Sequence, residues 1–455
     1  MNTPDFLIQN VKKYPNEPAL SSKDKSGNWE TDSWNDVHTS VIDVAKSLLY
    51  HNIGQNDKVS IYSYNRKEWN YIYLATQFIN SAAVGIYHTS SSNEVEWVAG
   101  NSESKIIFVG DNPNDNQEND KMPINRLLEA LPKLNNVELV VTLPEVISSG
   151  NSKIISWDKF IENGKSIESS KVLDLLSKIK DEHTSSLIYT SGTTGNPKGV
   201  ELVHKNWNFL MDALSTPLTF FQGEKTISWL PGAHVFGQAL DNHFWVRRAM
   251  HSFIVDNPLN TVDFAKEVQP HLFCSVPRIY EKIYSNFIAA IESKAVLRFG
   301  LNIPLLSGIF KKKLKEAAGF GDLKFAISGA APINPDILAL FQKLDIPLFE
   351  GYGMTENTAG ATLNYLGHNK IGSVGKALPD TEIKIANDGE VMIQGDHVMK
   401  GYYKNPEATT ETLVDRWLYT GDIGKLDSDG YLFITGRKKE IYVSSAGKNI
   451  APLVI

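Results

Sequence analysis

Residues 185–200 of this 455-residue chain carry the side chains best suited to binding an anion. They read Ser-Ser-Leu-Ile-Tyr-Thr-Ser-Gly-Thr-Thr-Gly-Asn-Pro-Lys-Gly-Val. Glycines let backbone N–H groups come close to a ligand, and the hydroxyls and the ammonium group donate hydrogen bonds to anionic oxygens. We therefore predict a loop that holds a polyphosphate. The residues that would contact it are Thr190, Ser191, Gly192, Thr193, Thr194, Gly195 and Lys198.

This loop departs from the common Gly-x-x-x-x-Gly-Lys-Ser/Thr pattern of nucleotide-binding loops. The fifth residue after Gly192 is Pro197, and Gly199 follows Lys198 in place of Ser or Thr. A flexible surface turn could have the same composition without a ligand. The specific order of twelve residues favours the binding loop over the surface turn.

Two further candidates each follow a predicted strand. In Ile-Ser-Gly-Ala-Ala-Pro at 327–332, the small Gly329 and Ala330 would let a flat ring or a phosphate approach the backbone. In Glu-Gly-Tyr-Gly-Met-Thr-Glu at 350–356, Tyr352 offers an aromatic face for a purine. Thr355 offers a hydroxyl, and Glu356 offers a hard oxygen ligand for Mg²⁺. Taken singly, a tight turn or a solvated surface glutamate explains either segment.

Two C-terminal motifs add a carboxylate and a basic run. Asp422, which follows Gly421, could accept hydrogen bonds from both hydroxyls of a ribose. Arg437, in Gly-Arg-Lys-Lys-Glu, could contact ribose or phosphate through its fixed fork of donors. A run of three basic residues more often lies on a solvated surface than in a binding site.

Alternating patterns predict the elements that position these residues. In the first half, the spacing of apolar residues predicts helices at 34–50 and 66–80 and strands at 58–63, 105–109, 137–143 and 187–189. The second half repeats the alternation, with helices at 205–216, 277–299 and 334–344 and strands at 225–229, 323–328 and 346–350. We predict an α/β protein with largely parallel sheets.

From about residue 371 we expect the helices to stop. Short β runs at 382–385, 390–393 and 431–435 are separated by Gly and Asp turns. The predicted organisation is two α/β subdomains over about 1–370 and a smaller β-rich subdomain over about 371–436.

The charge, the cysteine content and the distribution of apolar residues limit the classes of protein to which this chain can belong. The net charge of −7 gives no global attraction to nucleic acid, and the single Cys274 excludes an internal disulfide. The first residues lack the basic start and apolar stretch of a signal peptide, and no window holds the roughly 18 apolar residues of a membrane span. We expect a cytoplasmic protein with one candidate membrane contact.

That candidate contact is the segment 303–315, where apolar residues lie beside the lysines 311–313 and 315. Such a pattern suits anionic lipid headgroups. An ordinary helix packed on the domain with a solvated lysine face is the alternative, and the sequence favours this alternative.

Taken in order, the five motifs resemble the motif series of the adenylate-forming superfamily, which includes acyl-CoA synthetases, adenylation domains and firefly-luciferase-like proteins. The resemblance extends from about residue 5 to the end. Val-Pro-Arg-Ile-Tyr-Glu-Lys-Ile at 276–283 and the run from Gly436 to Pro452 are similar to strings of long-chain fatty acyl-CoA synthetases. Leu-Pro-Gly-Ala-His at 230–234 resembles a more widely shared motif.

The resemblance implies a large multi-subdomain N-terminal domain and two half-reactions. A fatty acid carboxylate attacks the α-phosphorus of ATP, and coenzyme A then displaces AMP to form a thioester. Because the first step needs little covalent work from the protein, alignment and charge neutralisation dominate catalysis. The implied partners are fatty acid, ATP, Mg²⁺ and coenzyme A, and no nucleic acid.

The resemblance also implies roles for single residues. Thr190, Ser191, Thr193, Thr194 and Lys198 would hold the β- and γ-phosphates, and Thr355 the α-phosphate. Thr193 and Glu356 would fix Mg²⁺. Gly329, Ala330, Gly351 and Tyr352 would frame the adenine with Glu350 at its edge, and Asp422 and Arg437 would hold the ribose. His234 would lie near the acyl carboxylate, although a buried structural histidine is the alternative, and Lys439 would be the hinge.

Members of the superfamily continue for roughly a hundred residues beyond Pro452, as a small mobile domain that carries a catalytic lysine. Residues 437–455 would then be the hinge and the truncated start of that domain. We expect the 455 residues by themselves to be deficient in both half-reactions. Two other readings remain: an acyl-adenylating enzyme that loads another acceptor such as a carrier protein, and a non-catalytic ATP- or acyl-binding module.

Overall fold

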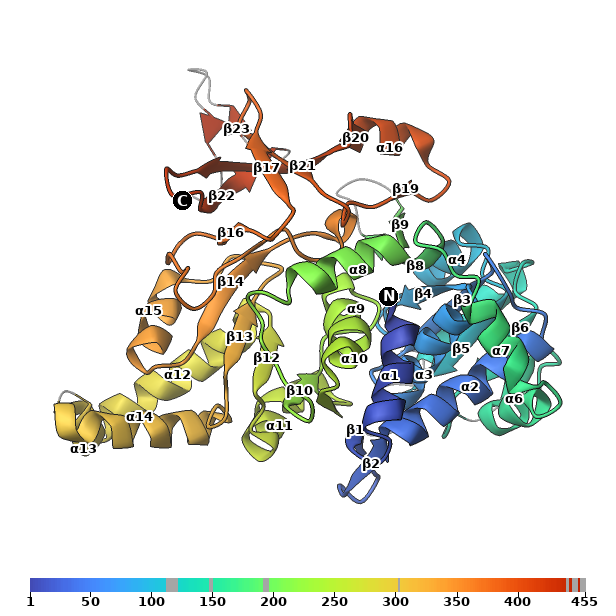
Figure 1. The fold of residues 1–455 in the computed structure, drawn as a ribbon, viewed down its shortest axis with the longest axis horizontal. Coiled ribbons are helices and arrows are strands. Elements are labelled where there is room, and N and C mark those ends of the chain that lie inside the picture. Colours follow the sequence, from blue (N-terminus) through green and yellow to red (C-terminus); the bar gives the residue numbers. More distant parts are fainter. Residues whose placement is uncertain are drawn as a thin grey trace.

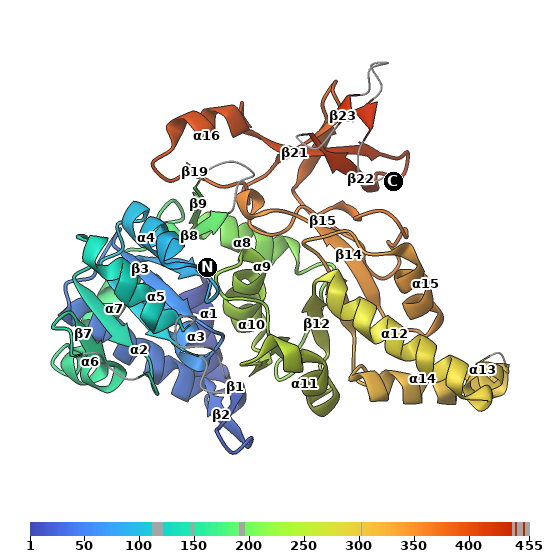
Figure 2. The same ribbon diagram turned by 180° about the vertical axis from the view of Figure 1, so that it is seen from behind.

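The structure, a computed structural model, describes residues 1–111, 122–146, 150–190, 196–301, 303–438, 442–443 and 449–450. Two α/β layers lie side by side, and a β-rich part lies across one end of both (Figure 1). The view from behind shows the same three parts (Figure 2). The predicted α/β class with a smaller β-rich subdomain is confirmed. The polar stretch at 112–121 lies outside the described residues.

The first layer contains an eight-stranded sheet in the order β19-β9-β8-β4-β3-β5-β6-β7. Strands β3 to β7, and the pair β4–β8, are parallel, whereas β9 pairs antiparallel with both β8 and β19. The strands are β3 Lys58–Ser63, β4 Ala82–Ile86, β5 Ile106–Gly110, β6 Leu139–Thr142, β7 Ile154–Ser156, β8 Thr184–Thr190, β9 Lys198–Val203 and β19 Gly401–Tyr402.

Helices cover both faces of this sheet, so its central strands are buried on both sides, as expected for parallel strands. On β5, Ile106 and Phe108 pack in the core shared with α2 and α3, whereas Ile107 and Val109 pack in the core shared with α4 and α5. The helices are α1 Thr3–Lys13, α2 Trp34–Tyr50, α3 Lys67–Phe78, α4 Ser92–Asn101, α5 Pro123–Ala130, α6 Trp157–Gly164 and α7 Ser169–Leu176.

The second layer contains a nine-stranded sheet in the order β16-β15-β14-β13-β12-β10-β11-β1-β2. Its centre is parallel and its edges are antiparallel. The strands are β1 Pro18–Lys23, β2 Trp29–Ser33, β10 Lys225–Ser228, β11 His251–Ile254, β12 Leu272–Ser275, β13 Phe325–Ser328, β14 Leu348–Tyr352, β15 Thr362–Leu363 and β16 Lys376–Ala377. Cys274 is buried in β12, as expected of a core residue.

The helices of the second layer correct one prediction. The helix expected over 277–299 is two helices, because Lys294 has an extended backbone between α12 and α13. Apolar spacing continues through this break, so periodicity does not reveal it. The helices are α8 His204–Ala213, α9 Val235–Gln238, α10 Trp245–Arg248, α11 Thr261–Val268, α12 Pro277–Ser293, α13 Ala295–Gly300, α14 Pro304–Ala318 and α15 Pro335–Lys343.

The β-rich part is a five-stranded antiparallel sheet with a small core of its own. The expectation that helices stop at about 371 is wrong, since α16 spans Pro406–Thr412. The side chain of Asn405 caps that helix by accepting the N–H of Ala408 at 3.0 Å. The strands are β17 Glu382–Ile385, β18 Glu390–Gln394, β20 Leu413–Val414, β21 Trp417–Leu426 and β22 Leu432–Arg437, and a separate hairpin pairs β23 Tyr442–Val443 with β24 Asn449–Ile450.

Across the described ranges, we find no helix with the length and apolar character that crossing a bilayer requires.

Candidate functional site

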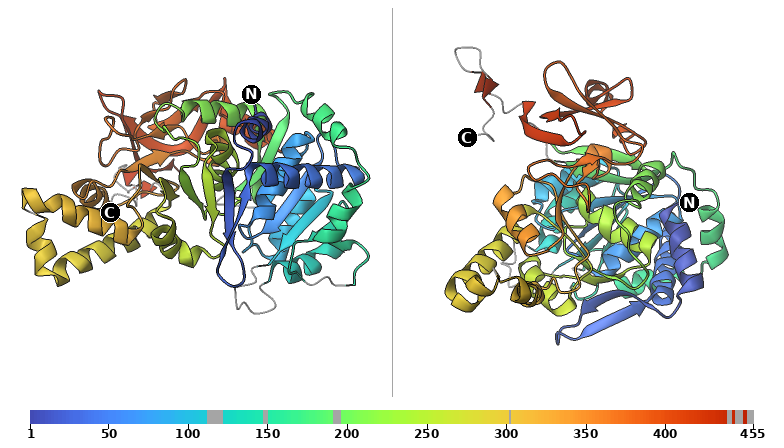
Figure 3. Two further views of the ribbon diagram at one scale, coloured as in Figure 1. Left: turned by 60° about the horizontal axis from the view of Figure 1, so that its bottom comes forward. Right: turned by 60° about the vertical axis from the view of Figure 1, so that its left-hand side comes forward.

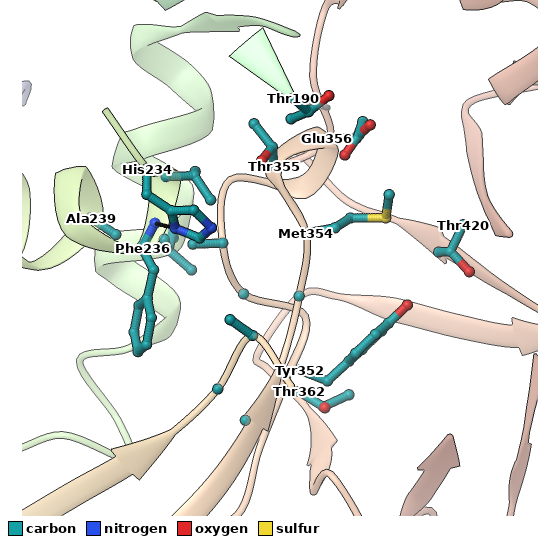
Figure 4. Close-up of a pocket in the computed structure, with 18 of the residues that line it drawn as sticks. Thr190, His234, Phe236, Ala239, Tyr352, Met354, Thr355, Glu356, Thr362 and Thr420 are labelled. Carbon is teal, nitrogen blue, oxygen red and sulfur yellow. Dashed lines mark hydrogen bonds between the residues drawn. The ribbon is translucent and has the colours of Figure 1, made fainter. Parts of the chain in front are cut away.

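A cleft of about 650 Å³ is lined by residues of both α/β layers and of the β-rich part. It collects many of the side chains that the sequence singled out, from segments far apart in the chain. The predicted residues that line it are Thr190, Lys198, His234, Gly329, Ala330, Gly351, Tyr352, Thr355, Glu356 and Arg437. Figure 4 shows His234, Tyr352, Thr355 and Thr420 around a common space, with Thr190 near Glu356.

The other predicted residues either do not line the cleft or lie outside the described residues. Glu350 and Asp422 do not line the cleft themselves, but each is next in sequence to a residue that does, Gly351 and Gly421. The predicted phosphate-loop residues 191–195 and the predicted hinge residue Lys439 lie outside the described residues.

The hairpin β8–β9 presents the described ends of the predicted phosphate loop. Thr190 and Lys198 are opposite each other in the antiparallel register. Next to Lys198, the carbonyl of Pro197 accepts a hydrogen bond from the indole of Trp97 at 2.8 Å. A hydroxyl and an ammonium group therefore enter the cleft together on a strand pair that holds their spacing.

Tyr402 connects this hairpin to Glu356, and sequence reasoning missed its role. Its hydroxyl donates to Oε1 of Glu356 at 2.7 Å, and its ring centroid lies 4.8 Å from Nζ of Lys198. Burial, together with the charge of Glu356, raises the pKa of Tyr402 far above its ordinary value, so the phenol remains a donor. The motif Gly-Tyr-Tyr at 401–403 was visible in the sequence, but nothing there indicates pairing with β9.

Asp422 lies between Tyr352 and Arg437. Its Oδ2 accepts the Tyr352 hydroxyl at 2.6 Å, and its Oδ1 pairs with Nε of Arg437 at 2.9 Å. The pairing of β21 with β22 places Asp422 opposite Arg437, which explains how residues 15 positions apart converge. The carboxylate is buried at 7% exposure, whereas the guanidinium is 50% exposed, so Arg437 can turn toward a ligand.

Glu390 also lines the cleft, as a buried carboxylate that the sequence did not indicate. Its Oε1 accepts the N–H of Gly421 at 2.8 Å, and its Oε2 pairs with Lys438 at 2.7 Å. Lys438 also pairs with Asp388 at 2.7 Å. These contacts hold the turn before Asp422 and the end of β22 in fixed positions.

Glu350 is a buried carboxyl in the middle of β14. Burial raises its pKa to about 7, against a partly opposing hydrogen bond from the backbone of Ile333. Near neutral pH the group is therefore present in both its neutral and its charged form. It can donate as well as accept a hydrogen bond, which a polar ring edge can use.

His234 caps the short helix α9. Its Nδ1 accepts the N–H of Phe236 at 3.1 Å, and Figure 4 shows the ring pointing into the cleft. Burial lowers the pKa of His234, so the imidazole is neutral at neutral pH and Nε2 carries the proton. The ring thus combines the two roles that the sequence left open, since it makes a structural bond and presents a donor to the cleft.

Beyond His234 the wall of the cleft is apolar. The side chains that form it are Leu210, Leu214, Val235, Ala239, Leu240, Ile327, Leu363 and Leu378. A cleft that combines the His234 donor with apolar side chains suits a carboxylic acid with an apolar chain.

The cleft is better suited to a metal ion that binds together with a phosphate substrate than to one held by the protein alone. The described residues contain no group of three or more His, Cys, Asp or Glu side chains placed to hold an ion. Glu356 supplies one hard carboxylate beside the phosphate hairpin. Mg²⁺ is commonly held by one or two carboxylates together with substrate phosphates.

The hairpin that carries Thr190 and Lys198, the Asp422–Arg437 pair and a group of apolar side chains thus meet at one cleft. The profile of the family described as AMP-binding enzyme matches residues 7–403. The chain therefore belongs to the AMP-binding, adenylate-forming enzyme family.

Within this family the chain is similar to fatty-acid–CoA ligases. It is 31% identical to long-chain-fatty-acid–CoA ligase FadD15 of Mycobacterium bovis, over 90% of this chain and 70% of that protein. It is 30% identical to long-chain-fatty-acid–CoA ligase ACSBG2 of Gallus gallus, over 98% of this chain but only 62% of that protein. The fold is similar to O-succinylbenzoate CoA synthetase of Bacillus subtilis in complex with ATP and magnesium, with a TM-score of 0.73, 22% identity, and coverage of 98% and 82% of the two chains.

Proposed function

We propose that this protein activates a fatty acid with ATP and transfers the acyl group to coenzyme A. The observation that carries the proposal is the cleft itself, which joins a phosphate hairpin, Glu356, the Asp422–Arg437 pair and an apolar pocket. The relatives named long-chain-fatty-acid–CoA ligases support the fatty acid as substrate and coenzyme A as acceptor.

The proposed first step joins two anions. A carboxylate oxygen attacks the α-phosphorus, the bond from that phosphorus to its bridging oxygen breaks, and pyrophosphate leaves. Lys198 and the hydroxyl of Thr190 neutralise phosphate charge, with residues 191–194 assigned to the same task from the sequence. His234 donates its Nε2 proton in a hydrogen bond that orients the carboxylate, and Thr355 contacts the α-phosphate.

The nucleoside is held by the β14 and β21–β22 side of the cleft. Asp422 and Arg437 bind the ribose hydroxyls, and the ring of Tyr352 packs on the adenine. Gly329, Ala330 and Gly351 frame the base because they carry little or no side chain. Glu350 lies at the base edge, where its partly protonated carboxyl can match a ring donor or acceptor.

Glu356 and Thr193 would hold Mg²⁺, and Tyr402 orients Glu356. When bound, the ion withdraws charge from the phosphate oxygens and so favours attack at the α-phosphorus. The ATP and magnesium named for the Bacillus subtilis structure support this cofactor choice.

The proposed second step is attack by the coenzyme A thiolate on the acyl carbonyl carbon, with AMP as the leaving group. We propose that residues 1–436 form the large AMP-binding domain and that 437–455 contain the hinge, with Lys439 at its pivot. That these 455 residues are deficient in both half-reactions stays a prediction, which comparison with a chain extended by a C-terminal domain of the family tests.

Exchange of radioactive pyrophosphate into ATP tests the proposal. Exchange that requires a fatty acid, followed by thioester formation with coenzyme A, supports it. If the thioester forms on a carrier-protein thiol and not on coenzyme A, the proposed acceptor is wrong. If both this chain and the extended chain bind ATP but catalyse no exchange, the protein is a non-catalytic binding module.

A further inference from the structure

The helices α12, α13 and α14 form an arm (residues 277–318) that extends from the second α/β layer (Figures 1 and 3). Its outer end does not line the cleft. Binding of the substrates in the cleft therefore does not explain the exposed side chains at this end of the arm.

The end of the arm exposes apolar side chains on α13, on the connection that follows it and on α14. Phe299, Ile303, Leu306 and Ile309 are between 41% and 62% exposed, and we call these four residues the arm tip. Leu306 and Ile309 lie on one side of α14. The adjoining side of α14 is packed, because Leu314 is buried and a Cβ at Gly300 would collide with the ring of Phe310.

The sequence favoured an ordinary packed helix for 303–315, whereas this exposure of apolar side chains supports the membrane contact. An ordinary packed helix would bury its apolar residues and expose only lysines. Here α14 has a second apolar face that is exposed to solvent.

Positive charge surrounds the arm tip. From Lys294 to Lys315 the sequence has six lysine and arginine residues and no aspartate or glutamate, in a chain of net charge −7. Lys312 and Lys313 are exposed, and Nζ of Lys312 lies 3.8 Å from Oε1 of Glu316 on the next turn. Lys311 differs, since its Nζ pairs with Asp345 at 2.9 Å.

We propose that the arm tip docks on an anionic lipid surface. The apolar side chains enter the headgroup region, while Lys312 and Lys313 contact lipid phosphates. A second copy of the chain fits the surface less well, because a two-fold contact would place this cationic cluster against itself. Four side chains are also far fewer than the roughly 20–30 residues that each partner contributes to a stable protein interface.

Co-sedimentation with vesicles tests the proposal on the full 455-residue chain. The probes are vesicles of phosphatidylcholine mixed with phosphatidylglycerol, and vesicles of phosphatidylcholine alone. We expect binding to the anionic vesicles that weakens in high salt. Lys312→Gln/Lys313→Gln should reduce partitioning roughly thirtyfold, since each lysine near an anionic surface contributes about fivefold. Leu306→Ser/Ile309→Ser should reduce it about tenfold or more.

The chain offers matched controls. Lys12 and Lys13 are also consecutive exposed lysines on a helix, and Leu259 is an exposed leucine outside the arm. Lys12→Gln/Lys13→Gln and Leu259→Ser should bind vesicles as the wild type does. ATP affinity should be equal in all variants, which separates this proposal from the nucleotide site and reports that each variant is folded.

Three results would overturn the proposal. The first is wild-type binding to neutral vesicles as strong as to anionic ones. The second is an equal loss of binding in the Lys12/Lys13 and Lys312/Lys313 variants. The third is self-association in sedimentation velocity that Leu306→Ser/Ile309→Ser abolishes, which would assign the arm tip to a second copy.

Discussion

Replacing Tyr402 by phenylalanine removes one hydroxyl and keeps the ring. The hydroxyl donates to Oε1 of Glu356 at 2.7 Å, whereas the ring faces the ammonium group of Lys198 at 4.8 Å. Tyr402→Phe therefore separates the support of the proposed metal ligand from the packing around the phosphate hairpin.

The expected loss follows from the contact that disappears. A hydrogen bond to a charged group contributes about 1.5–3 kcal/mol, which corresponds to roughly ten- to a hundredfold in an equilibrium constant. Loss of a residue that orients a metal ligand typically costs a similar 10- to 100-fold in metal affinity. We expect the Mg²⁺ concentration needed for half-maximal ATP binding to rise by about this factor, as measured by calorimetry over a Mg²⁺ series.

Tyr403 provides the matched control. It is the next residue, and its hydroxyl reaches Glu103 at 3.3 Å outside the cleft. Tyr403→Phe should bind Mg²⁺–ATP as the wild type does. If Tyr402→Phe keeps both wild-type Mg²⁺ dependence and wild-type thermal stability, the reasoning that links Tyr402 to the metal through Glu356 is refuted.

The remaining predictions concern four other groups. Thr193→Ala and Glu356→Ala should each weaken Mg²⁺-dependent ATP binding, and unchanged calorimetric affinity in both would remove the metal assignment. His234→Ala should raise KM for the fatty acid roughly tenfold or more and leave KM for ATP near its wild-type value, because one donor to a carboxylate is lost; equal effects on both substrates would contradict this. The pKa of Glu350 rises in the folded state from 4.5 to about 7, so the folded chain binds more protons and loses stability as the pH increases through that window. In the wild type, the free energy of unfolding measured in urea should fall by roughly 3 kcal/mol between the two pKa values, and Glu350→Gln should remove this fall. An unchanged pH dependence in the variant would show that Glu350 is not its source.

Short continuous motifs in the sequence identified many of the residues that line the cleft. The sequence pointed to Thr190 and Lys198 through one continuous motif, and the hairpin places them opposite each other. The resemblance assigned Asp422 and Arg437 to one ligand, and the register of β21 with β22 brings them together. The resemblance was needed to combine the separate motifs, since each of them has an ordinary structural explanation.

Long-range pairing accounts for what the sequence did not reveal. Tyr402 lies on the two-residue strand β19, which reaches the cleft only by pairing with β9 about two hundred positions earlier. Likewise, β1 and β2 at the N-terminus join the second sheet beside β11. The break at Lys294 lies inside an uninterrupted apolar pattern, so it too was invisible, although it creates the turn of the arm.

The most direct test of the central claim follows the oxygen atoms of the acid. A fatty acid labelled with ¹⁸O in its carboxylate is incubated with ATP, Mg²⁺, coenzyme A and the extended chain, and the AMP is examined by mass spectrometry. Attack of the carboxylate on the α-phosphorus, followed by cleavage at the acyl carbon, predicts one ¹⁸O atom in each AMP. Unlabelled AMP, or label in inorganic phosphate together with ADP, would contradict the account.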